Sequence, residues 1–186
     1  MKSFISTLAA AATIATIALA STGAYAADGT ITFTGAVTDT TCSIDGKTAG
    51  TADKNVTLPT VTASTLPATG ATAGSTPATD LVFTLSGCST EAKAVARFEN
   101  GPTIDQTTGY LVNQAPAGAQ NVQVRLLNAA HNPINVVTGA NNDLAGNGVA
   151  IVTGAANLQY FAEYYATGKA TAGPVNTSVQ YTVDYQ

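Results

Sequence analysis

Alternation of apolar and polar residues with a period of two recurs along this chain, and it is the feature that most limits the possible folds. This period predicts β-strands, because successive side chains of a strand point to opposite faces of the sheet. Clusters of Gly, Pro, Asn and Asp bound most alternating segments. The expected strands are 30–37, 56–58, 81–85, 95–98, 110–112, 122–127, 134–137, 148–152, 158–165 and 178–185.

Helical periodicity is nearly absent. The candidates are a short turn at 91–94 and one near Leu66, within the Thr-, Ala-, Gly- and Pro-rich loop 60–79. Turn residues recur at the spacing expected of a sandwich or barrel, and no linker separates two complete sets of strands. We therefore expect a single all-β domain, an antiparallel β-sandwich with Greek-key character.

The first 26 residues have the layout of a secretory signal peptide. Lys2 supplies a basic start, an Ala-rich apolar run covers 4–20, and Ala24-Tyr25-Ala26 forms a small-x-small cleavage site. A transmembrane anchor is the alternative, but the run is short and contains polar threonines. Removal after Ala26 would leave residues 27–186, in which no stretch is apolar for long enough to predict a membrane span.

Two cysteines, Cys42 and Cys88, fall in the predicted exported part of the chain. An even pair in an exported protein predicts a disulfide, which would tie the first strand to the end of strand 81–85. The chain-entropy model gives such a bridge roughly 4 kcal/mol of stabilisation. A metal site is disfavoured because His131 is the single histidine and there is no CxxC pair. We expect neither metal nor cofactor.

Charge and motifs exclude several classes of function. Charged residues make up 10% of the chain, its formal net charge is −4, and the basic residues are scattered, so no nucleic-acid partner is expected. A secreted hydrolase would depend on His131, and no Gly-x-Ser-x-Gly motif is present, so we expect no enzyme. Tyr160, Tyr164 and Tyr165 could form a sugar-binding platform, although such clusters more often belong to the core and rim of a strand.

The segments near the two ends of the chain alternate most clearly. Near the C-terminal end, Val179, Tyr181, Val183 and Tyr185 share one face of a strand, which should be buried on that face. Near the other end, the strand that carries Ile31 and Phe33 can pair within its own domain or with another chain. Capture of an extended peptide by an open sheet edge is a known recognition mode.

These residues resemble a chaperone–usher pilin subunit of the type-1-like major fimbrial class. The opening segment 28–35, followed by Val37 and Cys42, resembles a pilin N-terminal extension that runs into its first strand. The Cys42/Cys88 spacing is pilin-like, and the ending 179–186 resembles the pilin C-terminal strand with its penultimate tyrosine. Gly173 lies fourteenth from the C-terminal residue, where pilins place a glycine.

The resemblance implies an incomplete immunoglobulin-like Greek-key sandwich that lacks its last strand and is completed by donor-strand exchange. The implied division is a signal peptide at 1–26, a donor-strand extension at 27–37 and a pilin domain at 38–186. Gly29, Ile31 and Phe33 would be the donor positions. The implied acceptor groove, which would also contact the chaperone and other subunits, comprises Gly173, Val179, Tyr181, Val183 and Tyr185.

The implied function is a structural subunit that polymerises into a surface fimbria, or pilus, used for bacterial attachment and biofilm formation. Export through the periplasm to the cell surface is expected. Implied partners are further copies of the chain, a periplasmic pilus chaperone, an outer-membrane usher and a tip adhesin. Alternatives from other classes are a secreted β-sandwich binding module, a minor or adaptor fimbrial subunit and, third, the hydrolase.

Overall fold

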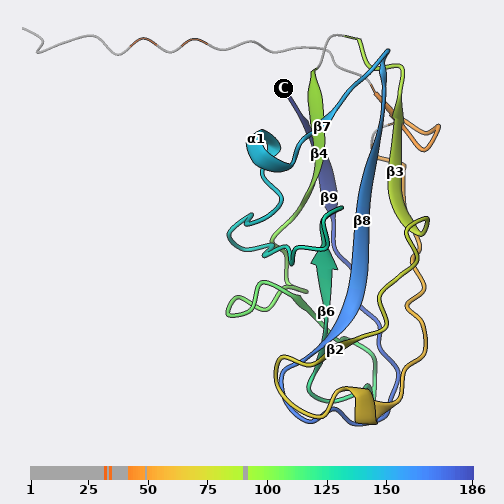
Figure 1. The fold of residues 1–186 in the computed structure, drawn as a ribbon, viewed down its shortest axis with the longest axis vertical. Helices are drawn as coiled ribbons and strands as arrows, with labels where there is room; N and C mark the ends of the chain where they lie inside the picture. Colours follow the sequence, from red (N-terminus) through yellow and green to blue (C-terminus); the bar gives the residue numbers. More distant parts are fainter. Residues whose placement is uncertain (1–31, 33, 35–41, 49, 90–91) are drawn as a thin grey trace, which may run out of the picture. The chain divides into compact units, whose positions relative to one another are not determined.

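Two β-sheets account for most of the regular structure in the described part of the chain (Figure 1). The computed structural model describes Thr32, Thr34 and residues 42–48, 50–89 and 92–186. The predicted signal peptide at 1–26 therefore lies outside the described residues, as does most of the predicted extension at 27–37. The described residues from Cys42 onward belong to one compact unit.

The larger sheet is built around β8 (Ala155–Ala166), the longest strand of the described chain. Its order is β1-β3-β8-β6-β5, with β2 paired to β8 outside this path, and every pairing is antiparallel. β3 pairs with the first half of β8 and β6 pairs with the second half. The other strands are β1 (Ser43–Ile44), β2 (Thr72–Ala73), β3 (Leu81–Ser86), β5 (Leu111–Val112) and β6 (Val122–Leu127).

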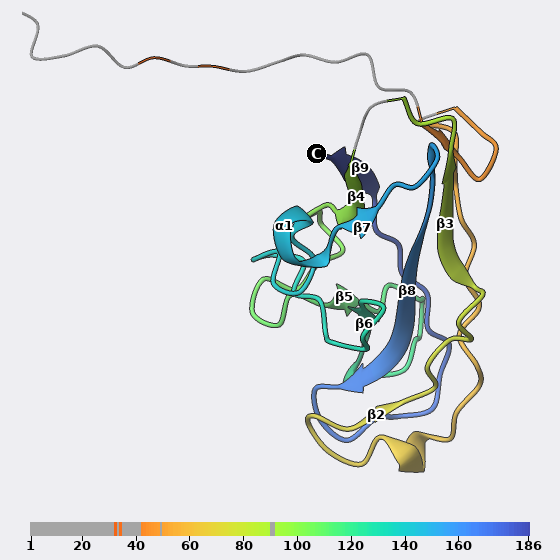
Figure 2. The same ribbon diagram turned by 45° about the horizontal axis from the view of Figure 1, so that its top comes forward.

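The smaller sheet has the order β7-β4-β9 and is also antiparallel. Its strands are β7 (Val149–Ala150), β4 (Lys93–Phe98) and β9 (Tyr181–Tyr185). In Figure 2 these three strands lie together, separate from β3. A 3₁₀ turn, η1 (Ala63–Thr65), and a one-turn helix, α1 (Leu144–Asn147), complete the regular elements that the structure describes. The Asp143 carboxylate caps α1 by accepting a hydrogen bond from the Gly146 N–H at 2.6 Å.

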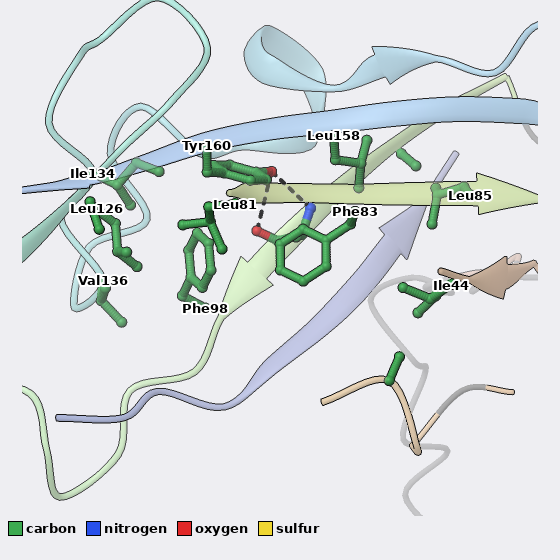
Figure 3. Packing of buried hydrophobic residues seen from close by; sticks show 14 of the residues in the cluster. Ile44, Leu81, Phe83, Leu85, Phe98, Leu126, Ile134, Val136, Leu158 and Tyr160 are labelled. Carbon is green, nitrogen blue, oxygen red and sulfur yellow. Dashed lines mark hydrogen bonds between the residues drawn. The ribbon is translucent and has the colours of Figure 1, made fainter. Parts of the chain in front are cut away.

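The main core lies between the two sheets (Figure 3). Phe83 and Leu85 of β3 and Leu158 and Tyr160 of β8 point into it, because alternate residues of a strand share a face. The edge of the Tyr160 ring meets Phe98 of β4, with ring centroids 5.1 Å apart. A second, smaller apolar cluster contains Leu66, Ala119, Val122, Ala166 and Ala170.

The prediction of an all-β sandwich is confirmed, and so is the short helical turn near Leu66. Three local predictions are wrong. Residues 56–58 form no strand, and 134–137 make only isolated bridges, because Asn135 bonds back to Ala140 and Thr138 to close a turn. The turn predicted at 91–94 is wrong where the structure describes it, because β4 begins at Lys93 and is already paired there with β7.

Candidate strand-acceptor edge

β9 is the outer strand of the smaller sheet, and its bonds to β4 fix which way its backbone groups point. Gln186 exchanges hydrogen bonds with Lys93, with N–O distances of 3.0 and 3.1 Å, and the carbonyl of Gln180 accepts from the Glu99 N–H at 2.9 Å. In an antiparallel pair the bonded residues recur at every second position. The even-numbered residues of β9 therefore direct their backbone groups toward β4.

The backbone N–H and C=O groups of Tyr181 and Val183 consequently point to the opposite edge of β9. No other strand of the described chain pairs with β9 along that edge. A strand edge in this state is a template for a further strand.

The side chains along β9 are also only partly covered. Tyr181, Val183 and Tyr185, together with Val179 two residues before the strand, contact the main core, yet each is only half-buried. Of the residues predicted on the other face, Ser178, Gln180 and Thr182 are exposed, while Asp184 is partly buried and pairs with Arg97. An apolar row that faces a core and keeps part of its surface accessible can be covered by one more strand.

Tyr181 connects β9 to the opposite layer of the sandwich. Its ring lies 4.5 Å from the ring of Phe83 in β3, and its hydroxyl donates to the Ala52 carbonyl at 2.6 Å. Burial raises the pKa of Tyr181, and the negative charges of Asp45 and Asp53 raise it further. The phenol is therefore held neutral as a donor at the margin of the core.

The facing edge of β3 is closed, in contrast with β9. Asp45 bonds to Thr84 twice, through its own N–H to the carbonyl at 2.8 Å and through Oδ1 to the Thr84 N–H at 2.9 Å. The Lys54 ammonium donates to the Val82 carbonyl, makes an ion pair with Asp45 Oδ2 at 3.0 Å and lies 5.3 Å from the centre of the Phe83 ring. Beyond the two residues of β1, the backbone N–H of Asp45 and the side chains of Asp45 and Lys54 thus take the place of a strand here.

These contacts explain why residues 56–58 form no strand. Lys54 attaches the segment to β3 through its side chain, so no backbone ladder forms. Val56 and Leu58 still pack against the core, which accounts for their alternating pattern. The sequence pattern gives no sign of the roles of Asp45 and Lys54, because one acid and one lysine nine residues apart carry no periodic signal.

The predicted disulfide is present. Cys42 lies directly before β1 and Cys88 lies two residues after β3, and their Cα atoms are 4.4 Å apart. The bridge ties the first described strand to the end of β3, as the sequence predicted.

Gly173 has a packing role that its position alone did not reveal. A Cβ at this residue would lie 2.5 Å from the backbone nitrogen of Ala119, so a larger residue would push the two backbones apart. The neighbouring Pro174 carbonyl accepts from that same Ala119 N–H at 3.0 Å. These contacts are with the loop at 113–119, and a role for Gly173 in an acceptor groove stays a prediction.

The donor positions Gly29, Ile31 and Phe33 lie outside the described residues, and their role also stays a prediction.

Tyr160, one member of the suggested sugar platform, is only 4% exposed. Its hydroxyl accepts from the Ala96 N–H at 2.9 Å, and Asn142 Nδ2 donates to the Ala96 carbonyl at 2.8 Å (Figure 3 shows the Tyr160 bonds). Burial raises the pKa of Tyr160 to about 12. Tyr160 therefore belongs to the core.

Within the described ranges, no group of three or more His, Cys, Asp or Glu side chains is placed to hold a metal ion. The helices in the described part of the chain are too short to cross a bilayer.

Comparisons with known proteins agree with this geometry. The profile of a family described as fimbrial protein matches residues 31–186. The major fimbrial subunit SMF-1 of Stenotrophomonas maltophilia is 46% identical over 153 residues, which cover 80% of this chain and 86% of that protein. The F17 fimbrial protein of Escherichia coli is 43% identical over 155 residues, with 80% and 82% covered.

Among solved structures, a chaperone–usher pilus described in relation to rod uncoiling has the same fold, with a TM-score of 0.57. Its subunit is 21% identical, and the match covers 86% of this chain and 96% of that chain. The two sheets, the disulfide and the family match over most of the sequence lead to one conclusion. The chain belongs to the fimbrial protein family and is a structural, non-enzymatic subunit of a surface fimbria.

Proposed function

We propose that residues 27–37 of one copy complete the sandwich of another copy by lying along the outer edge of β9. The observation that carries this proposal is the half-buried apolar row of β9 beside backbone groups that point away from β4. Gly29, Ile31 and Phe33 would face the core side of the inserted strand, and Val179, Tyr181, Val183 and Tyr185 would receive them.

The energetics favour a long-lived complex. Burial of Ile31 and Phe33 contributes on the order of 2–3 kcal/mol each. Each backbone hydrogen bond along the new ladder adds roughly 1 kcal/mol. The β9 edge can accept a further strand, whereas the side chains of Asp45 and Lys54 close the edge of β3. Dissociation of the inserted strand should therefore be very slow. A fibre whose subunits share no covalent bond depends on this slow dissociation to stay intact.

A periplasmic chaperone and an outer-membrane usher would be the assembly partners. Before assembly the β9 edge needs a temporary cover, because an open apolar edge promotes aggregation. A chaperone that supplies an extended strand would satisfy that need, and exchange at the usher would replace it with the extension of the next copy. Removal of residues 1–26 frees the extension for this exchange.

The test is assembly with altered extensions. Substituting aspartate at both Ile31 and Phe33 should abolish the SDS-resistant ladder of unboiled surface fimbriae, because two charges would have to enter the core. Aspartates at Thr32 and Thr34, on the opposite face of the same strand, form the matched control and should leave the ladder in place.

Both variants keep the β9 edge, so both should still form a complex with the chaperone. A normal ladder from the Ile31/Phe33 variant would show that this strand is not the donor. A stable monomer without chaperone, seen by size-exclusion chromatography of residues 27–186, would favour a free-standing binding module instead.

A further inference from the structure

A cavity of about 410 Å³ lies between the end of β4 and the loop that precedes α1. Residues 97–100 form one wall, and residues 134–139 and 142–144 form the other. In Figure 1 this loop and α1 lie beside β4. The volume falls within the range of about 300–1,000 Å³ that is typical of sites for small ligands. The cavity is therefore large enough to hold a small organic molecule.

Two backbone groups of β4 lie at this cavity without partners. The odd-numbered residues of β4 bond to β9, as Lys93 and Glu99 do, so Phe98 directs its N–H and C=O to the opposite edge of the strand. On that edge β7 pairs with Lys93 and Ala94, and no other group in the described part of the chain bonds to the Phe98 backbone. Phe98 lines the cavity, which thus gains one donor and one acceptor.

Asn142 brings a third polar group to the cavity wall. The residue is only 7% exposed, and its Nδ2 donates to the Ala96 carbonyl at 2.8 Å. Its Oδ1 is buried and accepts no hydrogen bond from the residues that the structure describes. Because an unpaired buried acceptor is unfavourable, a bound molecule that donates a hydrogen bond would stabilise Asn142.

The charged side chains around the cavity disfavour an anionic ligand. Arg97 makes an ion pair with Asp184 of β9. Glu99 accepts a hydrogen bond from the Thr182 hydroxyl at 2.7 Å, and Asp143 caps α1. Since Asp184 neutralises the guanidinium, the carboxylates of Glu99 and Asp143 leave an excess of negative charge at the wall.

The free edge of β4 is too short to add a peptide strand. The backbone of Ala96, two residues before Phe98, already bonds to the Tyr160 hydroxyl and to Asn142. Phe98 is therefore the one residue of β4 whose groups remain free on this edge, within the chain that the structure describes. Strand addition depends on a row of such groups.

A sugar matches the same groups without needing a ladder. Each sugar hydroxyl can donate one hydrogen bond and accept others. The C–H groups of a sugar ring are apolar, and the buried side chains of Ile134 and Val136 line the cavity. A neutral sugar therefore suits both the polar and the apolar parts of the wall.

We propose that this cavity binds a small neutral sugar, whose hydroxyls donate to Asn142 Oδ1 and to the Phe98 carbonyl and accept from the Phe98 N–H. The proposal goes beyond assembly, because the site lies within one subunit and does not depend on strand donation. In a fimbria the site would repeat at every subunit. Repetition would raise the avidity for a surface that carries many copies of the sugar.

Saturation-transfer NMR on purified fimbriae tests this site. Lactose, maltose and cellobiose serve as neutral probes, and spermidine and citrate serve as the cationic and anionic probes. At least one neutral sugar should receive saturation at its ring protons. Val137→Trp, which puts a larger side chain at the cavity wall, should lower that signal about tenfold. Val152→Trp, the same substitution at a 65% exposed position outside the cavity, is the matched control and should keep the signal.

Asn142→Ala provides a second test through the proposed hydrogen bond. It should lower the sugar signal about tenfold, as expected for one lost hydrogen bond to a buried partner. The SDS-resistant ladder of unboiled fimbriae shows whether each variant still assembles. Absence of transfer to all three sugars, or equal signals from Val137→Trp and Val152→Trp, would overturn the proposal. Displacement of the sugar by spermidine or citrate would mean that the cavity takes a charged ligand instead.

Discussion

β8 and β9 have the same alternating pattern and very different surroundings. In β8 the inward residues are closed off, with Leu158 at 0% and Tyr160 at 4% exposed. In β9 the inward residues contact the same core and remain half-buried. β8 has β3 beside its first half and β2 and β6 beside its second half, whereas β9 has β4 alone among the described strands.

The difference shows that burial of a strand depends on its neighbours more than on its own sequence. Alternation specifies that one face is apolar, and it carries no information on whether a neighbouring strand comes from the same chain. β8 is therefore a completed element of the fold, while β9 is the element through which the subunit would be completed.

The largest expected effect is on assembly through the inner face of β9. Val183→Asp should abolish polymer formation, because the carboxylate would lie between β9 and the core when the donor strand covers it. The readout is the SDS-resistant ladder of unboiled fimbriae. Thr182→Asp places the same charge on the exposed face of the same strand and should leave the ladder intact. Equal ladders from both variants would remove the distinction between the two faces of β9.

The next effect compares β8 and β9 in the stability of the free subunit. Leu158→Ala should lower the free energy of unfolding by about 2–5 kcal/mol, since it leaves a cavity in a closed core. Val183→Ala should cost about 1 kcal/mol, because its side chain is only half-buried. Urea unfolding of residues 38–186 measures both.

Adding a peptide of residues 27–37 should sharpen this comparison. The cost of Val183→Ala should increase when the peptide is bound, whereas that of Leu158→Ala should change little. If both costs stay the same with and without peptide, Val183 does not lie under the inserted strand.

Local pattern predicted most strands correctly, because residues such as Phe83, Leu85 and Leu158 alternate within one element. It failed for 56–58, where the side chain of Lys54 replaces a backbone ladder. It also could not explain Gly173, whose close approach to Ala119 joins loops more than fifty residues apart. The face of β9 was predictable, whereas its half-buried state is a property of the assembled sheets.

High pH gives a smaller effect that distinguishes the tyrosines of the two strands. The folded-state pKa of Tyr160 is raised to about 12, above its unfolded value near 10. The neutral Tyr160 phenol therefore makes its full contribution to the free energy of unfolding below pH 10. That contribution, up to about 2–3 kcal/mol, is lost as the pH rises from 10 toward 12. Unfolding measured across this range should show the fall. Tyr160→Phe should flatten it, at a cost of about 1–3 kcal/mol at neutral pH for the unpaired Ala96 N–H.

Tyr181 should respond to the donor strand where Tyr160 does not. Burial already raises the pKa of Tyr181, and an inserted strand would bury its ring further. Ultraviolet titration should therefore show the Tyr181 pKa higher with the 27–37 peptide than without it. An unchanged titration would place the peptide elsewhere than beside β9.

The smallest expected effect concerns the closed edge of β3. Lys54→Met keeps the aliphatic stem against Phe83 and removes the donor to the Val82 carbonyl and the partner of Asp45. We expect a loss of about 1 kcal/mol in the free energy of unfolding, because the pair is partly exposed and each bond contributes modestly. Lys47→Met, at an exposed position of the same loop, should change stability by less than about 0.5 kcal/mol.

The opened β3 edge should also make the free Lys54→Met subunit more prone to aggregate, which light scattering would detect. A Lys54 variant as soluble as the unaltered subunit would mean that β3 is protected by something other than this lysine, and that the contrast between the closed and open edges has another cause.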